Sequence, residues 1–147
     1  MSILALTNGD DHPEAAQKHL LDAQALLAQQ RPDGAAYLSG YVVECALKSL
    51  WLHERGVASG PPTGSPGHDL AHLESQVATF ASVAGAKTAR YFKTATAGVS
   101  QGAIASWTPS MRYRSATMTL ADARAWYAIA SDVFRETIAQ MRLDGVL

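Results

Sequence analysis

The chain has little of three things that often define a protein's class: cysteine, excess charge and long apolar runs. Its 147 residues include one cysteine, so no disulfide can form within the chain, and we expect a cytoplasmic protein with Cys45 as a small core residue. Twelve lysines and arginines stand against 13 aspartates and glutamates, for a formal net charge of -1. Proteins that coat nucleic acid regardless of sequence carry a large positive excess, so any nucleic-acid contact here must come from a local patch.

No stretch reaches the roughly 18 to 20 uninterrupted apolar residues of a membrane span, so we expect no membrane contact. The N-terminal sequence MSILALTNGDDHPEAAQ has no positively charged start and no convincing cleavage site, which argues against a signal peptide. Hydrophobic residues make up 48% of the chain and charged residues 17%, as in globular proteins. The length predicts one domain over residues 1–147, with residues 1–10 as a loose lead-in.

Strand and hairpin patterns are also missing, and helical periods take their place. Residues 11–30 open with Asp11 and Glu14 in a capping-box-like pattern. The RPDG sequence then breaks this helix, so a second helix over residues 33–55 should run antiparallel to the first. It is too long and too uniformly apolar for a surface helix and should be the central element. The glycine- and proline-rich residues 56–67 form a loop.

Three segments separate this loop from the last helix: a third helix over residues 68–83, a less regular helix over 86–97, and an irregular connection over 98–118. The last helix opens with a capping pattern at Thr119 and Asp122, and its apolar residues keep helical spacing. The fold class we expect is all-α, an up-and-down four-helix bundle with a short helix or irregular segment before the last helix.

The second helix is apolar around most of its circumference, yet Glu44 and Lys48 interrupt it. At 100° per residue, these two share a face with four further residues: Tyr37, Tyr41, Trp51 and Arg55. Glu44 precedes Lys48 by four residues, the favourable order for an ion pair. The face is a solvated stripe, a homodimer seam with buried aromatic rings, or the wall of a groove in which rings stack on a base and cations face phosphate.

Two further segments contain candidate site residues. His68 ends the loop, with His72 one turn later, but Asp69 stands where a metalloprotease needs Glu and no third ligand is evident, so we expect no metal. His68 therefore either makes local hydrogen bonds at a helix start or contacts an anion in a site. The WTPSMRYRS stretch contains Arg112 and Tyr113, which are either surface residues or an anion-binding arginine with an aromatic neighbour.

Together, AYLSGYVVECALKSLWLHERG, the later GHDLAHL and the MRYR ahead of the last helix resemble the HEPN domain (higher eukaryotes and prokaryotes nucleotide-binding). The resemblance covers about residues 12–142. It implies an up-and-down four-helix bundle, commonly dimeric. Many prokaryotic members work beside a minimal nucleotidyltransferase in toxin–antitoxin or defence modules. Some are metal-independent ribonucleases, whose motif is an arginine followed after four to six residues by a histidine.

No arginine of this chain has a histidine at that distance, so the ribonuclease motif is absent. The resemblance then implies a module that binds nucleotide, RNA or a partner protein, without a cofactor. It carries over five candidate ligand-binding residues: Glu44, Lys48, His68, Arg112 and Tyr113. Their expected roles are phosphate contact for Lys48 and Arg112, stacking for Tyr113, a hydrogen bond from His68, and orientation of Lys48 by Glu44. Two other functions are open: a ribonuclease that uses His68 with Arg112 or Glu44, and a purely structural oligomerisation subunit.

Overall fold

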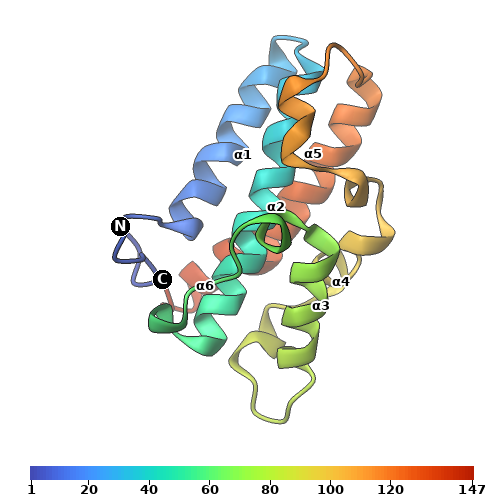
Figure 1. Cartoon of the computed structure of the whole chain (residues 1–147). Coiled ribbons are helices and arrows are strands. Elements are labelled where there is room, and N and C mark those ends of the chain that lie inside the picture. Colours follow the sequence, from blue (N-terminus) through green and yellow to red (C-terminus); the bar gives the residue numbers. More distant parts are fainter.

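The computed structural model describes residues 1–147, and all of its regular elements are helical, which confirms the all-α prediction. Three long helices lie side by side: α1 (His12–Ala28), α2 (Pro32–Arg55) and α5 (Leu120–Phe134) (Figure 1). A fourth helix, α3 (Leu70–Ala81), packs against α2. The lead-in has no helix, but Leu4 within it is buried, with only 7% of its surface exposed. None of the helices has the length and apolarity needed to cross a membrane.

The reversal between α1 and α2 follows the local signals. Asp11 accepts a hydrogen bond from the backbone N–H of Glu14 at 3.4 Å, as the capping pattern predicts. The first helix ends at Ala28 rather than near residue 30, because Gln30 adopts a φ of 55°. The second helix begins with Pro32 as its first residue, a position where the missing N–H costs nothing.

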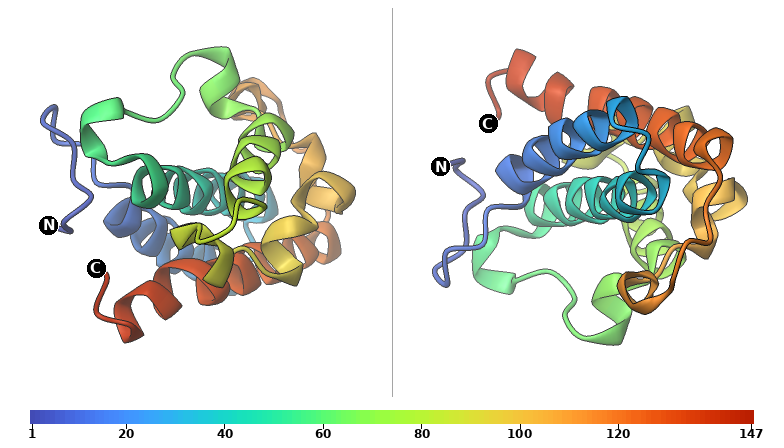
Figure 2. Two further views of the ribbon diagram at one scale, coloured as in Figure 1. Left: turned by 90° about the horizontal axis from the view of Figure 1, so that it is seen from below. Right: turned by 90° about the horizontal axis from the view of Figure 1, so that it is seen from above.

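Helix α2 is the central element, as predicted. Figure 2 shows it with α1, α3 and α5 around it. Every residue from Val42 to Leu50 is buried, including the two charged ones. The main core cluster joins α2 residues such as Leu47 to Leu73 of α3 and Val133 of α5. A solvated stripe on this helix is therefore wrong for its middle part, since no face of that part is left to water.

The loop after α2 contains two short 3₁₀ turns, η1 (Val57–Ser59) and η2 (Ser65–His68), where the sequence predicted no helical structure. The helix predicted over residues 86–97 is also wrong as a continuous element. It is split into a 3₁₀ turn, η3 (Lys87–Arg90), and a single α-helical turn, α4 (Thr94–Ala97). The break falls at Lys93, whose backbone is extended with a ψ of -166°.

Carboxylates from the long helices hold this broken segment in place. Glu54 accepts hydrogen bonds from the backbone N–H and the hydroxyl of Thr88 at 2.9 and 3.0 Å. Glu136 accepts from the N–H and hydroxyl of Thr96, each at 3.0 Å. Because these bonds satisfy N–H groups at the starts of η3 and α4, the segment does not need to form one long helix.

The irregular connection before α5 consists of three 3₁₀ turns: η4 (Val99–Gln101), η5 (Ala103–Ser106) and η6 (Pro109–Tyr113). The last helix starts as predicted, with the Thr119 hydroxyl accepting from the Asp122 N–H at 3.0 Å. It is not one regular helix, however. A π-helical turn (Arg135–Ala139) separates α5 from a final turn, α6 (Gln140–Leu143). The hydroxyl of Thr137 donates to the carbonyl of Val133 at 2.7 Å inside this stretch, a bond of the kind that often bends helices.

Candidate functional site

A hydrogen-bonded group of three charged or ionisable side chains, of which Glu44 and Lys48 are buried, joins α2 to the loop before α3. Lys48 Nζ lies 2.7 Å from Glu44 Oε1, and His68 Nδ1 lies 2.9 Å from Glu44 Oε2. Only 3% of Glu44 and 6% of Lys48 is exposed. Each oxygen of the Glu44 carboxylate therefore has one partner, so Lys48 and His68 bind it at the same time without competing. Three of the five residues selected from the sequence thus form one hydrogen-bonded unit.

The backbone brings these three residues together in two ways. Glu44 and Lys48 are four residues apart on α2 and share a face, while His68 comes from the end of η2. The loop that carries His68 folds tightly on itself, and this requires glycine at residue 67. A Cβ on Gly67 would lie 2.4 Å from the carbonyl oxygen of Pro62 and 3.6 Å from Lys48 Nζ. Any larger residue would therefore force the loop between Pro62 and His68 to shift.

His68 is not bonded within the helix start, as one of its two interpretations required. The residue that caps α3 is Asp69, whose carboxylate accepts from the N–H of His72 at 3.0 Å. His68 instead makes a long-range bond to α2, so the expectation of only local hydrogen bonds at a helix start is wrong. About 41% of its side chain is exposed, against 4% for Glu44. The imidazole therefore connects the buried carboxylate to the surface.

Aromatic rings from α1, α2 and the segment before η6 surround the exposed side of this group. The ring of Tyr41 meets four others edge-on or tilted, with centroid distances between 4.9 and 6.5 Å: those of His19, Tyr37, His68 and Trp107. The hydroxyls of Tyr37 and Tyr41 lie 3.3 Å apart. Burial, and the hydrogen bond from Tyr37, raise the pKa of Tyr41 above its usual value, so this phenol stays neutral. The rings of the predicted stripe thus pack against other rings of the same protomer, but Tyr37, Tyr41 and Trp51 are only half-buried and Arg55 is exposed.

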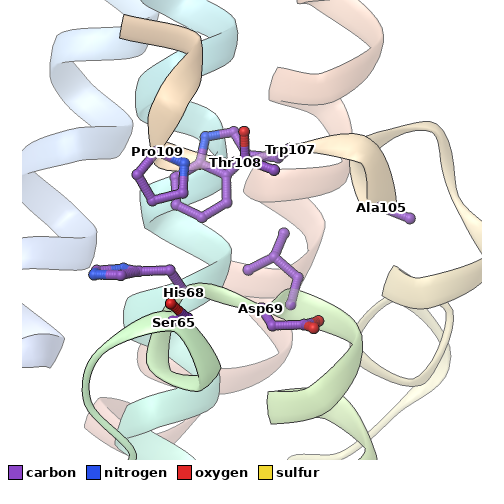
Figure 3. A pocket seen from close by; sticks show the side chains of 8 residues that line it. Ser65, His68, Asp69, Ala105, Trp107, Thr108 and Pro109 are labelled. Carbon is purple, nitrogen blue, oxygen red and sulfur yellow. The ribbon is translucent and has the colours of Figure 1, made fainter.

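A pocket of about 450 Å³ opens beside His68. Its walls come from the η2–α3 junction on one side and the η5–η6 segment on the other: Ser65, His68, Asp69, Leu70, Ala105, Trp107, Thr108 and Pro109. Figure 3 shows the imidazole of His68 on one side of the opening, with the rings of Pro109 and Trp107 on the other. A pocket with rings on two sides, and with polar side chains from Ser65, His68, Asp69 and Thr108, suits a flat ligand that has apolar faces and polar edges.

Trp107 is fixed in the wall of this pocket. Its indole N–H donates to the carbonyl oxygen of Tyr37 at 2.9 Å, and only 2% of its surface is exposed. The ring lies against Gly40, where a Cβ would come within 2.1 Å of its Cδ1 and Nε1 atoms. Trp107 was not among the residues selected from the sequence. One sequence signal could have found it. A glycine in the middle of a helix, such as Gly40, often marks a place where a large side chain packs closely, and Trp107 is such a side chain.

Arg112 and Tyr113 belong neither to the buried group nor to the walls of the pocket. Both are exposed, Tyr113 to 79%, and the Arg112 guanidinium carbon lies 4.8 Å from the Tyr113 ring centroid. Hydrogen bonding to Tyr113 and then to Tyr37 raises the pKa of Arg112, so its positive charge is secure. In a 3₁₀ helix residues i and i+3 are on the same face, so Arg112 lies on the Pro109 side of η6.

Two more histidines of α1 border the site, and the sequence selection missed them. His12 and His19 are seven residues apart, which places them on one face of α1, and that spacing is the signal that could have found them. His12 Nε2 and His19 Nδ1 are buried atoms without a hydrogen-bond partner in the chain. Burial lowers the pKa of both histidines, helped by Lys48 for His12 and by Lys18 for His19. Both are therefore held in the neutral form.

Metal binding has no support in this geometry. No group of three or more histidine, cysteine, aspartate or glutamate side chains is arranged to hold a metal ion. The groups present are a carboxylate-bound imidazole, a pocket lined partly by rings, and the exposed Arg112. No family model, no curated protein and no solved structure matches the chain.

Proposed function

We propose that the chain is a HEPN-like four-helix module that binds a nucleotide or RNA at the pocket between His68 and Pro109. The observation that carries the proposal is the fixed orientation of His68. Its Nδ1 is held 2.9 Å from the buried Glu44 carboxylate, which Lys48 holds in turn at 2.7 Å. An imidazole held in this way presents a rigid ring to a ligand, and aromatic rings stack on every base.

The distribution of charge supports the same ligand. The pocket walls contain no lysine or arginine, and the cation nearest in sequence to the wall is Arg112, on the Pro109 side of η6. A base in the pocket with its phosphate outside, on Arg112, satisfies both features. Lys48 takes a different role from the expected one. It is buried and paired with Glu44, so it orients the carboxylate and does not reach phosphate.

The test is a titration of the wild-type protein, His68→Ala and Arg112→Ala with mononucleotides and short single-stranded RNA at two salt concentrations. Loss of His68 removes one stacking face, worth about 1 to 3 kcal/mol of binding free energy. Loss of Arg112 should weaken binding and reduce its salt dependence. Arg124→Ala is the matched control, since Arg124 is also exposed but lies on α5 and not in η6. Wild-type protein that binds none of these ligands contradicts the proposal.

One observation favours a second function, metal-independent cleavage of RNA. His68 is bound by a buried carboxylate yet is 41% exposed, which suits a general acid or base. The test is incubation of labelled RNA with the protein in the presence of a metal chelator. Cleavage that is abolished in His68→Ala and strongly reduced in Glu44→Gln supports this function. Intact RNA after prolonged incubation with the wild-type protein contradicts it.

The resemblance also supports a homodimer and a minimal nucleotidyltransferase partner in a toxin–antitoxin or defence module. Tyr41 packs on Trp107 and Trp51 packs on Phe80 within one protomer, so a dimer seam along α2 would bury only the part of these rings that remains exposed. Light scattering at about 100 μM protein tests the dimer, since association depends on concentration. Purification from the native cell with identification of bound protein tests the partner.

A further inference from the structure

Asp69 gives the pocket a chemical preference that its ring walls lack. It is the only acidic residue in the lining, and it is exposed to the opening. One oxygen of its carboxylate, Oδ1, accepts from the N–H of His72 at 3.0 Å, while Oδ2 makes no hydrogen bond within the chain. Figure 3 shows this carboxylate pointing toward the Ala105 side of the pocket, away from His68. The far end of the pocket therefore offers a hydrogen-bond acceptor to whatever lies between the rings.

A carboxylate selects ligand groups by charge and by donor pattern. It repels phosphate, so the anionic end of a nucleotide must point out of the pocket. It only accepts hydrogen bonds, so the edge of the base that faces it must donate them. The remaining polar groups of the wall are hydroxyls, and those of Thr108 and of the nearby Ser110 are 2.7 Å apart and bonded to each other. A hydroxyl can both donate and accept hydrogen bonds, so these groups are compatible with a ligand edge that donates.

The four common bases differ in the edge that they present to a carboxylate. Guanine has two neighbouring donors, N1–H and the 2-amino group, which match the two oxygens of one carboxylate. Adenine and cytosine place a donor beside an acceptor, and uracil places a donor between two acceptors. An acceptor that faces a carboxylate leaves both groups unpaired, and such mismatches are strongly discriminated against.

We infer that Asp69 makes the pocket selective for guanine nucleotides, with the base between His68 and Pro109 and its donor edge on the Asp69 carboxylate. This inference rests on the proposed nucleotide-binding function and specifies its ligand. The role of Asp69 as the cap of α3 does not by itself require an acid. Asparagine caps helices about as well as aspartate.

The experiment measures affinity for GMP, IMP, AMP, CMP and UMP by calorimetry. The wild-type protein should bind GMP about ten- to a hundredfold more tightly than AMP, CMP or UMP. IMP, which keeps N1–H but lacks the 2-amino group, should bind with intermediate affinity. Asp69→Asn keeps the cap but places an amide donor where the second acceptor was, so it should bind IMP at least as tightly as GMP. Asp22→Asn on the exposed face of α1 is the charge-matched control and should keep the wild-type order.

The possible failures are distinguishable. Nucleotide binding by the wild-type protein with no base preference, or with a preference for adenine, overturns the guanine selectivity and leaves the proposed function standing. Absence of all nucleotide binding overturns both. Far-UV circular dichroism of Asp69→Asn shows whether α3 is retained. If this variant does not fold, the order of affinities in the wild-type protein still decides the question.

Discussion

The indole N–H of Trp107 donates to the carbonyl oxygen of Tyr37 at 2.9 Å, from a position 70 residues later in the chain. This bond seats the tryptophan in the groove that Gly40 leaves on α2, one turn from Tyr37. The same tryptophan forms a wall of the pocket beside His68. The packing of the irregular segment on α2 and the shape of the candidate site therefore depend on one contact.

Gly40→Ala tests the contact between Trp107 and α2, because it adds a clash with the ring while it improves helix propensity. Alanine is the better helix former by about 1 kcal/mol, but its Cβ would lie 2.1 Å from the Trp107 ring. Overpacking of this kind costs about 1 to 3 kcal/mol, so we expect a net loss of stability and a displaced Trp107. Urea unfolding and tryptophan fluorescence measure both. Gly34→Ala is the control on the same helix, where only the flexible Leu26 side chain must move, and it should be neutral or stabilising. Wild-type stability and fluorescence in Gly40→Ala would contradict the prediction.

The buried Glu44–Lys48 pair should show strong coupling. Glu44→Gln leaves the Lys48 ammonium buried and unpaired, so it should lower the free energy of unfolding by about 3 to 5 kcal/mol. Lys48→Met should cost less, because His68 Nδ1 still lies 2.9 Å from the Glu44 carboxylate. The double variant should lose much less than the sum of the two, because no unpaired charge remains. A double-mutant cycle in urea gives the coupling energy directly. Strictly additive losses would show that the two charges do not depend on each other.

Three histidines should make the fold less stable in mild acid. Burial lowers the pKa of His12, His19 and His53 in the folded protein, so the unfolded chain binds more protons as the pH falls. Their stabilising contribution is fully present above the unfolded value of about 6.5 and is lost as the pH falls through the folded-state values. Urea unfolding at several pH values between about 7.5 and 5 measures the loss. The stability of His19→Gln should depend less steeply on pH. A wild-type protein whose free energy of unfolding stays constant or rises as the pH falls would contradict the prediction.

Cys45 should be unreactive in the folded protein. Only 5% of its surface is exposed, and burial raises the pKa of its thiol to about 12, so almost no thiolate forms near neutral pH. A thiol reagent at about pH 8 should label the protein in urea at once and the native protein only at the rate of unfolding. Rapid labelling without denaturant would place Cys45 at an accessible position and contradict the structure.

The helices were predictable because their signals are local. The caps at Asp11 and Thr119, the break before Pro32 and the apolar length of α2 all act within a few residues, and the structure has each of them. The predicted helix over residues 86–97 failed for the opposite reason. Its N–H groups are satisfied by carboxylates from distant helices, such as Glu136 for Thr96, and no local pattern reveals such a partner.

For the candidate site too, local features were predictable from the sequence and long-range contacts were not. The sequence by itself determined that Glu44 and Lys48 share a face, because the helical period places residues four apart one turn from each other. Only the tertiary structure decided that this face is buried, that His68 reaches Glu44 and that Trp107 completes a pocket. The physical reason is that burial and long-range hydrogen bonds depend on how a loop and a 3₁₀ segment close over α2. That closure depends on contacts such as the one between Gly40 and Trp107, which joins residues far apart in the chain.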